Sequence, residues 1–81
     1  MQARVDVAKL TAPLRPVRVT MREAEVLYWV GEGKSDWEIG LILRLKPKSV
    51  NFHAEKLKVK LGVTNRVQMV RQAVRLGLLE A

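Results

Sequence analysis

The side chains best suited to recognise another molecule lie on one face of a helix expected over residues 47–61. At about 100° per residue, the apolar positions of this segment fall on one narrow arc and form its core face: Val50, Ala54, Leu57 and Leu61. Four side chains with recognition chemistry point away from that arc: Lys48, Asn51, Phe52 and Glu55. Asparagine can pair with adenine, glutamate can accept from cytosine, and phenylalanine can pack on a thymine methyl group. The face therefore predicts contacts to base edges, with packing of Phe52 on the N-terminal segment as the alternative.

The positive charge is concentrated in the same part of the chain. Residues 1–43 hold six basic and six acidic residues, whereas residues 44–75 hold nine basic residues and one acid, so the net charge of +7 arises in one stretch. Such a stretch attracts a polyanion through counterion release, and the alternative is an ordinary solvated surface. We expect seven residues to meet phosphates, which position a protein without specifying sequence: Lys34, Ser35, Ser49, Lys56, Lys58, Lys60 and Arg66. Helix capping alone would also explain Ser35.

The same composition argues against several other functions. The chain has no cysteine, a single histidine (His53) and no glycine-rich phosphate loop. We therefore expect no enzyme activity, metal, cofactor or small-molecule ligand. No apolar run reaches the roughly 18 residues of a membrane span, and we expect a cytoplasmic, nucleoid-associated protein. RNA binding is disfavoured because the few aromatic residues provide no evident stacking platform.

Helix start and stop signals predict an all-α fold with four helices and no strands. Thr20 with Glu23 and Ser35 with Glu38 each match the capping-box pattern, and Pro47 suits the first position of a helix. Several apolar residues before residue 47 are expected to face the core, with Met21 and Val26 flanking the first stripe: Ala24, Leu27, Val30, Ile39, Ile42 and Leu43. Only Arg44, Leu45 and Lys46 separate the second helix from the third, which is the spacing of a helix-turn-helix motif. Residues 1–19 are expected to be a tail or linker, and residues 20–81 the domain.

The fourth helix, expected over residues 64–76, carries two apolar stripes. We assign Val67, Val70 and Val74 to the core. The second stripe, Met69, Ala73 and Leu76, then predicts a dimer interface, because an isolated domain needs only one buried stripe. Coverage of that stripe by the N-terminal tail is the alternative.

Residues 20–79 resemble the DNA-binding domain shared by the LuxR, FixJ and GerE regulators. The resemblance rests on dispersed matches in unbroken order: Thr20, Arg22-Glu23, Glu25-Val26-Leu27, Gly33-Lys34-Ser35, Glu38-Ile39, Leu43, Ser49-Val50-Asn51-Phe52-His53, Lys60-Leu61-Gly62-Val63, Asn65-Arg66, Gln68, Ala73 and Gly77-Leu78-Leu79. Trp29, Trp37 and the Val-Asn-Phe-His string are more similar to the quorum-sensing branch. The chain departs from the family pattern at the cap of the third helix, where Lys46 stands in place of serine or threonine, and at Glu55, an acid on the outward face.

The resemblance implies a four-helix domain that binds double-stranded DNA and controls transcription. It further implies a homodimer meeting through the fourth helix on an inverted-repeat site, with RNA polymerase or a larger LuxR-type regulator as candidate protein partners. An interaction module that pairs with a larger LuxR-type regulator and titrates it is the alternative function. A nucleoid binder of low sequence specificity is a third.

Overall fold

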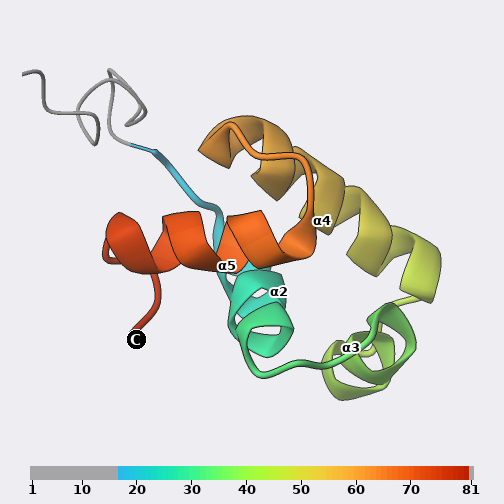
Figure 1. The fold of residues 1–81 in the computed structure, drawn as a ribbon. Coiled ribbons are helices and arrows are strands. Elements are labelled where there is room, and N and C mark those ends of the chain that lie inside the picture. The colour runs from blue at the N-terminus through green and yellow to red at the C-terminus, as the bar shows by residue number, and fades with distance from the viewer. Residues whose placement is uncertain (1–16, 81) are drawn as a thin grey trace, which may run out of the picture.

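Four α-helices and no strand make up residues 17–80, the part of the chain that the computed structural model describes. The helices are α2 (Met21–Gly31), α3 (Asp36–Leu43), α4 (Pro47–Leu61) and α5 (Arg66–Arg75) (Figure 1). The predicted all-α, four-helix class is therefore confirmed. The predicted tail lies outside the described residues except for its last three, of which Val17 and Val19 pack against the core. Within residues 17–80, no helix is both long and apolar enough to cross a bilayer.

Both predicted capping boxes are present. At the start of α2, the Thr20 hydroxyl accepts from the Glu23 amide at 3.1 Å, and the Glu23 carboxylate accepts from the Thr20 amide at 3.0 Å. Ser35 and Glu38 make the same reciprocal pair at the start of α3, at 3.2 and 2.9 Å. By contrast, α4 begins at Pro47 after Lys46, whose side chain makes no capping hydrogen bond. The proline restricts the backbone where no cap is available.

The turn between α3 and α4 is tight, as the predicted helix-turn-helix spacing requires. Arg44 ends α3 in the left-handed conformation with φ of 59°, which costs a non-glycine residue some backbone strain. The next amide, that of Leu45, donates to the Gly40 carbonyl at 2.8 Å. A side chain at Gly40 would collide with the Leu45 carbonyl, so the glycine lets the turn close over α3.

The hydrophobic core gathers around α4, which packs against each of the other three helices. Figure 1 shows α4 running along one side of the bundle, with its first turn beside α3. Its predicted core residues are fully buried: Val50, Ala54, Leu57 and Leu61. The partners of these side chains come from all three remaining helices: Val26, Leu27 and Val30 of α2, Ile39 of α3, and Met69 and Ala73 of α5. The prediction for α4 is therefore confirmed.

Two core assignments in the first half of the domain were wrong. Ala24 is exposed, and the buried stripe of α2 instead runs through Glu23, whose exposed fraction is 1%. In α3, Ile42 is 43% exposed, because the buried positions are Ile39 and Gly40. The fourth helix also begins later than expected, at Arg66, because Asn65 rather than Thr64 caps it by accepting from the Gln68 amide.

The assignment of the two stripes on α5 was wrong for Met69, Ala73 and Val67, whereas Val70 packs partly buried against the core as predicted. Met69 and Ala73, predicted to form an exposed dimer interface, are fully buried inside the monomer, and Leu76 packs partly buried against the core. Val67, predicted to be core, is 66% exposed. Both stripes have helical spacing, and only the packing of α5 against α2 and α4 determines which one faces inward.

A pair of substitutions in α5 tests this orientation. We expect Met69→Ala to lower the free energy of unfolding by about 2–5 kcal/mol, because it leaves a cavity among fully buried side chains. The control Val67→Ala removes an exposed side chain and should change it by less than about 0.5 kcal/mol. Urea denaturation followed by circular dichroism measures both. A larger loss for Val67→Ala than for Met69→Ala would restore the orientation expected from the sequence.

Candidate nucleic-acid interface

The outward face of α4 presents the predicted base-contacting residues together and accessible. Lys48, Asn51 and Glu55 are exposed, and Phe52 is 59% exposed although it is a large apolar side chain. Further along the helix, Val59 is 82% exposed, and a shallow, mainly apolar hollow lies between it and Phe52. Because α4 buries its opposite face in the core, these side chains are held on a rigid support. The prediction that they share one surface is confirmed, whereas their contacts to bases stay a prediction.

Two lysines on α4 interact with neighbours on the same helix. The Lys58 ammonium donates to the Glu55 carboxylate at 2.7 Å, one turn away. The Lys56 ammonium lies 5.5 Å from the centre of the Phe52 ring, within the range of a cation–π interaction. An exposed ion pair within a helix stabilises the folded state by only about 0.3–0.5 kcal/mol. Either Glu55 or Lys58 can therefore leave this pair to bind another partner.

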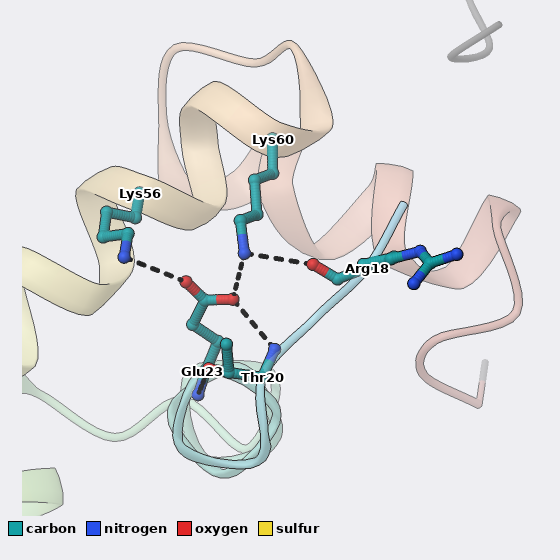
Figure 2. A network of polar contacts seen from close by, with 5 residues as sticks. All are labelled: Arg18, Thr20, Glu23, Lys56 and Lys60. Atoms are coloured by element: carbon teal, nitrogen blue, oxygen red, sulfur yellow. Dashed lines mark hydrogen bonds and ion pairs between the residues drawn. The ribbon is translucent and has the colours of Figure 1, made fainter. Parts of the chain in front are cut away.

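The ammonium of Lys60 is bound inside the protein rather than free on the surface. It donates to the Glu23 carboxylate at 2.6 Å and to the Arg18 carbonyl at 3.0 Å. Lys56 approaches the other carboxylate oxygen of Glu23 at 3.8 Å. Figure 2 shows both lysines reaching from α4 toward the start of α2, where Glu23 also accepts from the Thr20 amide. The capping box alone accounts for Glu23 in the sequence, and this cluster was not predicted.

The ionisation of Glu23 is decided by two opposing effects. Burial disfavours the charged carboxylate and would raise its pKa. The hydrogen bonds from Lys60 and from the Thr20 amide, with the charges of Lys60 and Lys56, outweigh burial and hold the pKa of Glu23 below its ordinary value. Glu23 is therefore a carboxylate at neutral pH. The pKa of Glu38 is also lowered, mainly by its hydrogen bonds with Ser35 and to a smaller extent by the charge of Lys34.

Arg66, another predicted phosphate ligand, is also paired internally. Its guanidinium donates to the Asp36 carboxylate at the start of α3, and both side chains are about one-third exposed. Lys34, Ser35 and Ser49 lie at or near helix starts, and the Ser35 hydroxyl already accepts the capping hydrogen bond. The seven predicted phosphate contacts therefore divide into two groups. Within residues 17–80, Lys60 and Arg66 are hydrogen-bonded to buried or partly buried acids and the other five are not, although Lys56 lies 3.8 Å from a carboxylate oxygen of Glu23.

His53, the single histidine, is partly buried beside Phe52 in an edge-on ring contact. Its Nδ1 atom is buried without a hydrogen-bond partner among the described residues. Over residues 17–80, no three histidine, cysteine, aspartate or glutamate side chains gather in a way that could hold a metal ion.

Comparisons with known proteins agree with the geometry. The family described as bacterial regulatory proteins of the luxR family matches residues 18–73. The transcriptional activator protein SolR of Ralstonia nicotianae is 48% identical over 67 residues, covering 83% of this chain and 28% of SolR. The quorum sensing-dependent transcriptional regulator RpaR of Rhodopseudomonas palustris is 42% identical, again over 83% of this chain and 28% of its own length. The chain thus spans little more than a quarter of these relatives.

Solved structures of VqmA from Vibrio cholerae share the fold. One is a complex with a ligand and DNA, and another is the VqmA dimer in the absence of target DNA. Both are 28% identical to this chain with a TM-score of 0.75. They cover 89% and 95% of this chain, and this chain covers 32% and 38% of theirs.

The buried carboxylate predicts an acid-sensitive fold. Because the folded-state pKa of Glu23 lies below its unfolded value of about 4.3, its contribution to stability is present above that pH and lost as the pH falls through the folded pKa. We expect Glu23→Gln to be about 1–3 kcal/mol less stable than the wild type at pH 7. The difference should shrink on acidification to pH 3.

Urea titrations at several pH values between 7 and 3 measure this. The control Glu38→Gln alters the other capping box, which is exposed, and should cost less at pH 7. If the two variants lose the same stability at every pH, the lysine cluster adds nothing to the cap.

Proposed function

The chain belongs to the luxR family of bacterial regulatory proteins, and we therefore propose that it binds double-stranded DNA sequence-specifically and regulates transcription. The observation that carries this proposal is the outward face of α4, where Lys48, Asn51, Phe52 and Glu55 stand exposed on a helix whose other face is buried. An α-helix fits the major groove of DNA. The base edges exposed in that groove distinguish all four base pairs. The likeness to RpaR motivates a place in quorum sensing.

In this proposal, α4 lies in the major groove and its first turns reach the bases. Asn51 would pair with an adenine, Glu55 would accept from a cytosine amino group, and Phe52 would contact a thymine methyl group. Lys48 would meet a guanine or a phosphate at the start of the helix. These four side chains stand on consecutive turns of one rigid helix, so their spacing along the groove is fixed.

Phosphate contacts are proposed for the five predicted residues that have no hydrogen bond to a buried or partly buried acid within residues 17–80. They are Lys34, Ser35, Ser49, Lys56 and Lys58. Lys56 and Lys58 flank the outward face of α4, and Lys34 with Ser35 lies at the start of α3, whose amides favour an anion. Lys60 and Arg66 are left out of this set, because their cations are satisfied by Glu23 and Asp36.

Asn51→Ala tests the proposed base contact. We expect it to cost about 1–3 kcal/mol of binding free energy on a selected DNA site and much less on random duplex, because only the selected site offers the adenine edge. Genomic-fragment selection followed by gel shift at two salt concentrations provides the sites and the affinities. Equal losses on both duplexes would mean that Asn51 only positions the protein. A wild-type protein that binds no duplex at low salt would favour the alternative of an interaction module.

We also propose a homodimer, with its interface moved to the stripe of α5 that the structure leaves accessible. Val67 is exposed, and Val70 and Val74 are partly exposed on the same side of the helix. Two grooves meet at Val70: Lys34, Arg66 and Arg71 line one, and Glu32 and Glu80 line the other. A two-fold axis near Val70 would place the basic groove of each copy opposite the acidic groove of the other. Candidate protein partners beyond a second copy are RNA polymerase and a larger LuxR-type regulator.

Val67→Glu should separate the copies without unfolding them. Val67 is 66% exposed, so the new carboxylate stays in water in the monomer. In the dimer it would be buried near the identical carboxylate of the second copy, and the two negative charges would repel each other. We expect helix content to be unchanged, half-site binding to survive and cooperative binding to an inverted repeat to be lost. Met21→Glu is a matched control, since it places a carboxylate at an apolar position that is 83% exposed on α2. Sedimentation that finds Val67→Glu still dimeric would exclude this face.

A further inference from the structure

A capping glutamate does more in this domain than capping requires. The cap at the start of α2 uses one carboxylate oxygen of Glu23, which accepts from the Thr20 amide. That oxygen also accepts from Lys60 at 2.6 Å, and the second oxygen lies 3.8 Å from Lys56 (Figure 2). The side chain is 1% exposed, so the carboxylate is almost closed off from water. A buried carboxylate needs partners of this kind, because its charge is costly to leave unpaired.

These contacts with Glu23 restrain the side chain of Lys60. It sits in the last turn of α4, on the helix proposed to enter the major groove, and its side chain is about one-third exposed. Its ammonium has two acceptors within the protein, Glu23 and the Arg18 carbonyl. If the Lys60 ammonium left these acceptors for a phosphate, the buried charge of Glu23 would lose its hydrogen-bonded cation. Lys56 is half exposed and at 3.8 Å from Glu23, so it is held more loosely.

The second capping box provides an internal comparison. Ser35 and Glu38 repeat the reciprocal hydrogen bonds of Thr20 and Glu23 with similar distances. Among residues 17–80 no lysine forms an ion pair with Glu38, and its box is exposed. The two glutamates therefore share one local role and differ in two respects, which are the burial of Glu23 and the pair of lysines that reach it from α4.

We infer that Glu23 is a positioning residue for DNA binding, which holds Lys60 away from phosphates and steadies Lys56 at the edge of α4. This inference rests on the proposed function. A lysine free to meet phosphates strengthens binding to every sequence alike, because phosphates carry no sequence information. Holding Lys60 inside the protein lowers affinity for random DNA while leaving the base-contacting face unchanged. Glu23 thereby limits the sequence-independent part of binding, to specific and random DNA alike, without touching DNA.

The salt dependence of binding to random duplex tests this inference in the whole chain. Glu23→Gln keeps the size of the side chain and an oxygen for the Thr20 amide but removes the charge that holds the lysines. We expect the slope of log affinity against log salt to become steeper by about 0.9 for each lysine released. Both affinities should rise at low salt, and the ratio of specific to random affinity should stay as in the wild type. Glu38→Gln, the matched control, should leave the slope as in the wild type.

The double variant Glu23→Gln with Lys60→Met should return the slope to the wild-type value if Lys60 is the lysine released. An unchanged slope in Glu23→Gln, with both affinities falling in parallel, would overturn the inference. A slope that becomes equally steep in Glu38→Gln would also overturn it.

If circular dichroism shows that Glu23→Gln is unfolded, the single variant Lys60→Met decides. Its slope should equal that of the wild type, and a slope shallower by about 0.9 would show that Lys60 already contacts phosphate. Absence of wild-type binding to any duplex would instead reject the proposed function itself.

Discussion

The packing of one face of α4 against the other three helices is the contact on which the domain depends. Val50, Ala54, Leu57 and Leu61 are fully buried, and each remaining helix supplies side chains to the same core. A domain of this size has little apolar surface to bury, so a helix that touched only one neighbour would be poorly fixed. Contact with three neighbours holds α4 along its length while its opposite face remains free. One helix can therefore form the middle of the core with one face and present exposed side chains to DNA with the other.

The sequence predicted α4 well and α5 poorly, for a physical reason that the two helices make clear. On α4 the four predicted core residues fall on one narrow arc, and lysines flank the opposite face, where Phe52 and Val59 also lie. Only one orientation of the helix therefore buries no charge. On α5, Val67 with Val70 and Met69 with Ala73 give two stripes of similar character. Choosing between them depends on the shape of the surface that α5 meets. Periodicity along one chain does not contain that information.

Glu23 was missed although the sequence carried a signal for it. The residue lies three, four and seven positions before Val26, Leu27 and Val30, which places it on the buried stripe of α2. The capping box explained the glutamate sufficiently to make a second role unnecessary, and Ala24 was taken as the core residue in its place. A titratable residue that falls on a core stripe requires a partner of opposite charge. The basic excess of residues 44–75 pointed to where that partner is found, but which lysine it is depends on how α2 and α4 pack.

The formal net charge of +7 is therefore a poor measure of the charge this surface offers to DNA. Lys60 is held by a buried carboxylate, Arg66 by Asp36 and Lys58 by an exposed Glu55, so the three cations differ in how readily they can be released. The pair of Arg66 and Asp36 has a further consequence, because it joins α5 to α3, two helices that share no close backbone packing among the described residues. Here a charge pair links two helices whose backbones do not pack closely together among the described residues. Lys60 and Arg66 thus link helices of this domain, and the proposed phosphate contacts fall to basic residues outside these two pairs.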